Sequence, residues 1–147
     1  MILDFTAKKI AGTIDSFNNS NKALFIRGDK GMGKTYSVLK YCEGHKNCLY
    51  FSFMNLDSEF ALNVFSNAYP EIFSVPSDWS SFFEQLACYA KKNRLTVFFD
   101  HIGNRNDKDE FNSALSAFLE TNGNAKIILI GKYWDKISVP YTYSSVG

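Results

Sequence analysis

The octapeptide "GDKGMGKT", residues 28–35, matches the pattern G-x-x-x-x-G-K-S/T. Glycines at this spacing let the backbone curl so that successive N–H groups point at phosphate oxygens. The lysine of the pattern reaches the β- and γ-phosphates, and the hydroxyl that follows it ligates Mg²⁺. We therefore predict a nucleotide-binding loop made of Gly28, Asp29, Lys30, Gly31, Met32, Gly33, Lys34, Thr35 and Tyr36.

A carboxylate that could share the metal ends the apolar run "LTVFFD", residues 95–100. In phosphate sites of this kind, Mg²⁺ is also held by an aspartate at the end of another buried strand. An aspartate that closes an apolar strand is a weak signal by itself, but Asp100 follows the phosphate-loop pattern in the expected order. The sequence thus predicts that Thr35 and Asp100 hold Mg²⁺, while Lys34 contacts the phosphates.

The surrounding elements must place these residues at one edge of a sheet. Short apolar runs predict strands, and segments with apolar residues at helical spacing predict helices. The predicted strands are 22–26, 48–53, 95–100 and 126–131, and the predicted helices between them are 34–42, 56–69, 77–93 and 108–123. Ser77 is the predicted cap of the third of these helices. This alternation predicts an α/β fold, a mainly parallel sheet with helices on both faces.

The chain length of 147 residues predicts a single domain over residues 1–147. Residues 1–21 open it with a predicted helix, and residues 132–147 form a tail. Within the tail, "YTYSSV" at 141–146 is a candidate edge strand. Aromatic residues are frequent in interface cores, so the aromatic-rich tail is also a candidate docking segment.

Composition restricts the function classes. A net charge of +1 gives no broad surface for nucleic acid or an acidic membrane, and no run approaches the roughly 20 apolar residues that span a bilayer. The three cysteines form no disulfide framework, which favours a reducing cytoplasm. "CEGHKNC", residues 42–48, lacks the fourth ligand that zinc requires. Cys88 is expected in the core.

The chain resembles P-loop ATPases of the AAA+ and STAND superfamily, in particular the archaeal and bacterial AAA-type ATPase domains. The pieces that carry the resemblance are "LFIRGDKGMGKT", "CLYFSF", "VFFDHIGN" and "KIILIGKY", which lie between residues 24 and 133. The resemblance implies a three-layer P-loop fold with strand order 5-1-4-3-2. It also implies that Asp100 is the Walker B aspartate and that ATP with Mg²⁺ is the ligand.

Several departures from the family pattern bear on hydrolysis. The residue after the Walker B aspartate is usually a glutamate that activates water, and here it is His101. Neutral histidine can act as that base, or His101 can be an inert packing residue. The fourth strand is expected to end at Gly131 and Lys132, where the family has a polar sensor residue, and we expect no helical lid within the residues up to 147. Candidate substitutes for the glutamate are Glu59, Asp107, Asp109 and Glu110. Arg105 is either an arginine finger toward a neighbouring subunit or a solvated loop residue, and Lys132 is a candidate contact to the γ-phosphate.

Together these observations predict an ATP-binding domain with weak or partner-stimulated ATP hydrolysis, which switches a protein partner or its own assembly. Lys34 and His101 are then the candidate catalytic residues. The alternative is a binding module that does not hydrolyse ATP, because His101 replaces the glutamate. A small-molecule kinase is disfavoured because no arginine-rich lid is present, and a DNA motor is disfavoured by the charge balance.

Overall fold

The computed structural model describes residues 2–17, 22–28, 33–54, 56–102, 108–121, 125–131 and 141–146. Within these residues, one sheet contains five parallel strands: β1 (Ala23–Gly28), β2 (Cys48–Ser52), β3 (Thr96–Asp100), β4 (Lys126–Gly131) and β5 (Tyr141–Val146). Their order is β2-β3-β4-β1-β5, so the predicted order 5-1-4-3-2, read from the opposite edge, is confirmed. The segment 141–146 is an edge strand beside β1.

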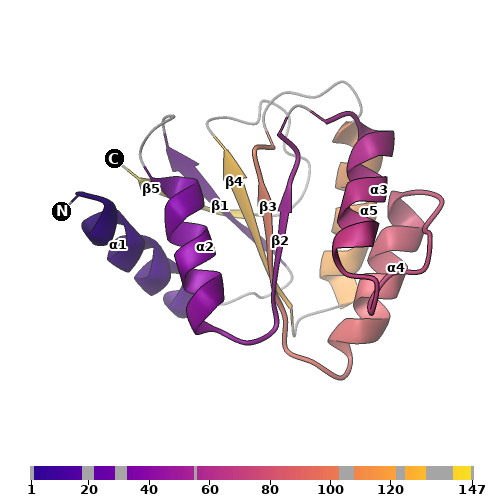
Figure 1. The fold of residues 1–147 in the computed structure, drawn as a ribbon, viewed down its shortest axis with the longest axis horizontal. Coiled ribbons are helices and arrows are strands. Elements are labelled where there is room, and N and C mark those ends of the chain that lie inside the picture. Colours follow the sequence, from indigo (N-terminus) through magenta and orange to yellow (C-terminus); the bar gives the residue numbers. More distant parts are fainter. Residues whose placement is uncertain are drawn as a thin grey trace.

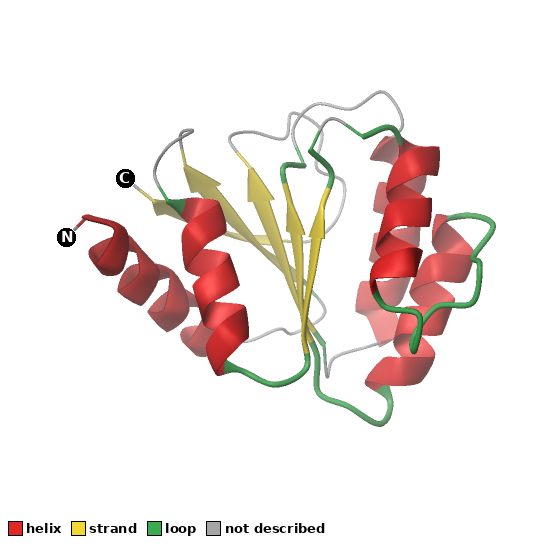
Figure 2. Cartoon of the chain, viewed as in Figure 1, coloured by secondary structure: helices red, strands yellow, loops and turns green. Residues whose placement is uncertain are grey.

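Helices cover both faces of the sheet, which confirms the predicted three layers (Figures 1 and 2). On one face lie α1 (Ile2–Ser16) and α2 (Lys34–Gly44). On the other face lie α3 (Ser58–Ala68), α4 (Trp79–Ala90) and α5 (Lys108–Thr121). Each face has its own buried apolar cluster, as expected when a parallel sheet is covered on both sides.

The strands are continuous apolar runs because successive side chains alternate between these two clusters. In β4, Ile128 and Ile130 pack toward α1 and α2, whereas Ile127 and Leu129 pack toward α3, α4 and α5. In β3, Phe98 belongs to the first cluster and Phe99 to the second. The side chain of Asp100, two residues after Phe98, therefore points to the face that α2 covers.

The aromatic residues mostly fill the core on the α3–α4–α5 face. Phe51 and Phe99 stack at a centroid distance of 5.3 Å, and Phe73 stacks on Phe82 at 4.4 Å. The centroid of the Trp79 ring is 5.1 Å from that of Phe111, in an edge-to-face arrangement. Such pairs stabilise a core beyond the effect of area burial alone.

Two expectations, one about a helix cap and one about burial, were wrong. Asp78, not Ser77, caps α4, because the Asp78 carboxylate accepts a 2.8 Å hydrogen bond from the Ser81 N–H. The first helix, within the predicted N-terminal segment, ends at Ser16. Cys88 is exposed, because the buried face of α4 is formed by Trp79, Phe82, Phe83, Leu86 and Ala90, and Cys88 lies away from that face.

Candidate nucleotide and metal site

The described part of the predicted phosphate loop is its end, where the loop enters α2. β1 ends at Gly28, residues 29–32 lie outside the described residues, and α2 begins at Lys34. Gly33 precedes the helix in a left-handed conformation with φ 80°, which glycine adopts without a steric penalty. The strand–loop–helix context that the pattern requires is therefore present. The positions of Asp29, Lys30, Gly31 and Met32 remain sequence predictions.

The first turn of α2 is held to Gly33. The carbonyl oxygen of Gly33 accepts a 2.9 Å bond from the Ser37 N–H and a 2.6 Å bond from the Ser37 hydroxyl. The N–H groups of a first helical turn have no partners within the helix and carry a partial positive charge, which attracts anions. Lys34 and Thr35 occupy this turn, and Tyr36 beside them is 43% exposed.

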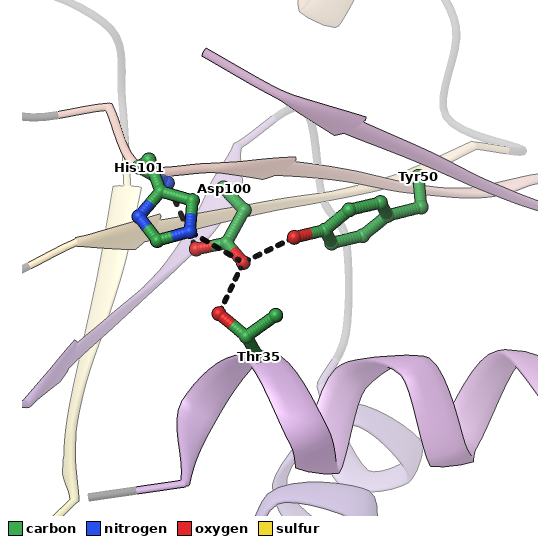
Figure 3. A network of polar contacts seen from close by, with 4 residues as sticks. All are labelled: Thr35, Tyr50, Asp100 and His101. Atoms are coloured by element: carbon green, nitrogen blue, oxygen red, sulfur yellow. Dashed lines mark hydrogen bonds and ion pairs between the residues drawn. The ribbon is translucent and has the colours of Figure 1, made fainter. Parts of the chain in front are cut away.

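Thr35 and Asp100 meet in the structure, as predicted from the sequence. The Thr35 hydroxyl donates a hydrogen bond of 2.8 Å to Oδ2 of Asp100, across 65 residues of sequence (Figure 3). Oδ1 of the same carboxylate accepts a 2.8 Å bond from the His101 N–H. Asp100 is only 2% exposed, so this carboxylate is a buried charge that is held by donors from two segments.

The chemistry of these two side chains is compatible with a bound magnesium ion. Carboxylate and hydroxyl oxygens are the hard ligands that Mg²⁺ prefers, and it takes few of them from the protein because water and phosphate oxygens supply the rest. Because the proton of the Thr35 hydroxyl is directed to Asp100, the lone pairs of Thr35 Oγ1 stay available to a cation. The buried carboxylate supplies the negative charge.

Tyr50 is a third member of this site, which the sequence motifs did not predict. Its hydroxyl donates a 2.5 Å hydrogen bond to Oδ2 of Asp100, the same oxygen that Thr35 contacts (Figure 3). Burial and this hydrogen bond to Asp100 raise the pKa of Tyr50 above the ordinary tyrosine value, which keeps the donor protonated. Strand alternation is the signal that could have found it: Tyr50 pairs with Phe98, so both share the face of Asp100.

His101 follows Asp100 in the left-handed region, with φ 56°. Histidine is one of the non-glycine residues that adopt this conformation more readily. The conformation lets the His101 N–H reach Asp100, and Nε2 of the ring lies 3.7 Å from Oδ2. The side chain is 38% exposed, so it is accessible to solvent rather than packed in the core.

The alternative catalytic groups either lie outside the described residues or are exposed to solvent. Arg105, Asp107 and Lys132 lie outside the described residues, as does the Asp109 side chain. Glu59 and Glu110 are exposed on α3 and α5, the helices on the face opposite α2. Neither is brought to the Asp100 side chain, which points toward α2.

The "CEGHKNC" segment forms a local contact between α2 and β2. The Cys42 thiol is hydrogen-bonded to Cys48, which raises the pKa of Cys42 and lowers that of Cys48. The His45 ring stacks on Tyr41 at a centroid distance of 3.8 Å, and its Nδ1 lies 2.8 Å from the Tyr41 carbonyl oxygen. His45 is thus engaged with Tyr41.

Comparison with known families places the chain among AAA domains. The sequence profile of the family described as "AAA domain" matches residues 20–133, which include the phosphate-loop pattern, Tyr50, Asp100 and His101. No curated protein sequence matches the chain.

Among the described residues, no helix combines the length and apolar character that crossing a membrane would need.

Solved structures share the fold at low sequence identity. A Walker-type ATPase of Pyrococcus abyssi has a TM-score of 0.59 and 10% identity over 95% of this chain and 52% of its own. A STAND ATPase with a tetratricopeptide repeat sensor from Pyrococcus horikoshii has a TM-score of 0.56 and 16% identity, over 95% of this chain and 22% of its own. PCH-2 of C. elegans has a TM-score of 0.55 and 13% identity, over 99% of this chain and 41% of its own. The chain therefore spans about half or less of each of these proteins.

Proposed function

Because the chain belongs to the AAA domain family, we propose that it binds ATP with Mg²⁺, hydrolyses the ATP slowly, and uses the nucleotide state to switch a protein partner or its own assembly. The observation that carries the proposal is the 2.8 Å contact between Thr35 and Asp100. A hydroxyl and a carboxylate that could share Mg²⁺ come together there from α2 and β3, at the carboxyl edge of the parallel sheet, which supports the proposal.

The residues of the chain divide the work of binding and turnover. The first turn of α2 offers N–H groups and a partial positive charge to the phosphates, and Lys34 adds a full charge. Bound Mg²⁺ would neutralise charge that develops on the transferred phosphate. Thr35 and Asp100 would hold that ion, and their mutual hydrogen bond means that both oxygens are already in place.

Slow hydrolysis is proposed because His101 stands where a glutamate commonly activates water in this fold. Its imidazole is solvent-accessible and close to Asp100, so a neutral ring can take a proton from an attacking water. The position of this base is less fixed than that of a glutamate side chain enclosed in the site, because the His101 ring is partly exposed to solvent. We therefore expect it to activate water less efficiently. A partner or a second copy of the chain would then complete the site.

Phosphate release from Mg²⁺–ATP tests the proposal, measured over a wide range of protein concentration. Lys34→Ala should abolish both turnover and nucleotide binding, whereas Lys46→Ala, which removes an exposed lysine in the turn before β2, should leave both unchanged. Turnover per molecule that rises with concentration would support completion by a second copy. Nucleotide binding that does not depend on Lys34 would overturn the proposal.

The second candidate is a module that binds ATP and leaves it intact. The replacement of the usual glutamate by His101 favours it. The same assay separates the two candidates: Lys34-dependent binding without phosphate release at any protein concentration selects the module.

A further inference from the structure

Tyr50 reaches the candidate metal site from β2, the edge strand beside β3. Its hydroxyl donates to Oδ2 of Asp100 at 2.5 Å, and the Thr35 hydroxyl donates to the same oxygen at 2.8 Å. Figure 3 shows the two hydroxyl groups approaching Oδ2 from different sides, with His101 beyond the carboxylate. Asp100 is thus held by β2, by α2 and by the backbone that follows β3.

The backbone of Tyr50 is itself fixed from both sides. On one side Tyr50 pairs with Phe98 in the β2–β3 ladder. On the other side its N–H donates a 2.9 Å hydrogen bond to the hydroxyl of Tyr69, just beyond α3. The Tyr69 ring packs edge-to-face against Phe51 at 5.3 Å. An edge strand held in this way keeps the phenol in place before any ligand binds.

The hydroxyl group, rather than the aromatic ring, distinguishes this position. Phe51 and Phe53, the neighbouring aromatic residues, point to the opposite face and belong to the α3–α4–α5 core. A carboxylate rotates about its last side-chain bond unless both oxygens have partners. The His101 N–H fixes Oδ1, and the hydroxyls of Tyr50 and Thr35 fix Oδ2.

We propose that Tyr50 is a positioning residue for the metal that accompanies the nucleotide. It acts through Asp100, because its hydroxyl holds Oδ2 of Asp100 beside the Thr35 hydroxyl. The two oxygens that would bind the cation, Asp100 Oδ2 and Thr35 Oγ1, are then already side by side before it arrives. Partners of this kind around metal-binding side chains commonly change metal affinity by one to two orders of magnitude. The inference rests on the proposed function, since it needs a nucleotide-bound cation.

The test measures magnesium uptake rather than turnover. A fluorescent ADP analogue is first bound to the protein in EDTA, and free Mg²⁺ is then titrated in while the fluorescence change is followed. Tyr50→Phe removes only the hydroxyl. We expect this variant to bind the analogue in EDTA as the wild type does, but to need roughly tenfold more Mg²⁺ for the half-maximal change.

Two controls separate positioning from a merely structural role. Tyr89→Phe removes a hydroxyl on α4, on the other face of the sheet, and should leave the magnesium midpoint unchanged. In an Asp100→Asn background, Tyr50→Phe should cause no further shift, because residues that act through one another are not additive. Thermal unfolding of each variant verifies that it is folded.

The outcomes also separate this inference from the proposed function. A wild type that takes up no nucleotide in a Lys34-dependent way refutes both. Wild-type binding with the same magnesium midpoint in Tyr50→Phe refutes the positioning role alone. The positioning role is also refuted if Tyr50→Phe weakens binding of the analogue in EDTA as much as it weakens binding with Mg²⁺. It is refuted as well if Tyr50→Phe shifts the magnesium midpoint in the Asp100→Asn background as much as it does in the wild type.

Discussion

The hydroxyl of Tyr41 donates a 2.9 Å hydrogen bond to Oδ1 of Asp15, and this bond joins α2 to α1. The two helices lie side by side on one face of the sheet (Figure 1). Burial and the hydrogen bond to Asp15 raise the pKa of Tyr41 above the ordinary tyrosine value of about 10. Deprotonation of Tyr41 would break this bond, so we expect the packing of α1 against α2 to weaken at alkaline pH.

Tyr41→Phe should flatten the loss of stability in alkali. The folded protein holds the Tyr41 proton more tightly than the unfolded chain does, so this contribution to the free energy of unfolding is complete below pH about 10 and is lost as the pH rises above it. In Tyr41→Phe that part of the slope is absent, and the free energy of unfolding near pH 8 is lower by about 1 kcal/mol because one hydrogen bond is missing.

Urea unfolding from pH 8 to 11 measures this effect. Tyr50 and Tyr69, whose pKa values are also raised, mainly by burial, keep a residual slope in the variant. Tyr89→Phe is the matched control for the loss of a tyrosine hydroxyl. Identical alkaline slopes in Tyr41→Phe and the wild type would contradict the prediction.

Two phenylalanines of α3 should differ sharply in their effect on stability. Phe65 is 1% exposed and contacts the rings of Phe51 and Phe53, whereas Phe60 on the same helix is 63% exposed. Phe65→Ala should lower the free energy of unfolding by about 3–5 kcal/mol, because it leaves a cavity in the core. Phe60→Ala should change it by about 0.5 kcal/mol or less. Chemical denaturation of both variants measures the difference, and similar losses would contradict the burial of Phe65 in the core.

The sheet could be predicted because buried parallel strands appear in sequence as short apolar runs. "TVFFD" and "KIILIG" have this form, since both of their faces are covered. The pairing of Thr35 with Asp100 could also be predicted, because the phosphate-loop pattern demands a carboxylate at the end of a second strand. Both inferences depend on local patterns with a known physical cause.

The parts that could not be predicted depend on long-range register and on single backbone angles. Strand alternation can place Tyr50 on the same face as Phe98, but its contact with Asp100 depends on the register in which β2 pairs with β3. His101 adopts its left-handed conformation directly after the last residue of β3, and no local sequence pattern predicts that backbone angle. Cys88 was misplaced because α4 is apolar over much of its surface, so the boundary of its buried face is poorly marked in the sequence.

His101→Asn should separate turnover from binding. Asparagine also tolerates the left-handed backbone that His101 adopts, but its amide cannot accept a proton as a base. If His101 activates water, phosphate release should fall by a factor of about 100 or more, while affinity for ATP stays within about twofold. Single-turnover phosphate release and equilibrium binding give the two values. A variant that hydrolyses ATP as fast as the wild type would assign water activation to another group.

Thr35 offers a variant pair that tests the metal site with little change in shape. Thr35→Ser keeps the hydroxyl that donates to Asp100, and Thr35→Ala removes it. We expect the serine variant to bind Mg²⁺–nucleotide much as the wild type does. The alanine variant should need roughly tenfold or more Mg²⁺ for the half-maximal change, because the cation loses a ligand. Oδ2 of Asp100 keeps Tyr50 as its hydroxyl partner in this variant, so the carboxylate itself should stay in place.

The magnesium titration with a prebound fluorescent nucleotide measures this pair directly. Binding in EDTA should be similar in both variants, because the phosphates are held by the helix N-terminus and Lys34 rather than by the Thr35 side chain. If the alanine and serine variants shared one magnesium midpoint, the Thr35 hydroxyl would be a structural partner of Asp100 and not a metal ligand. A loss of binding in EDTA for the alanine variant would instead place the hydroxyl against a phosphate oxygen.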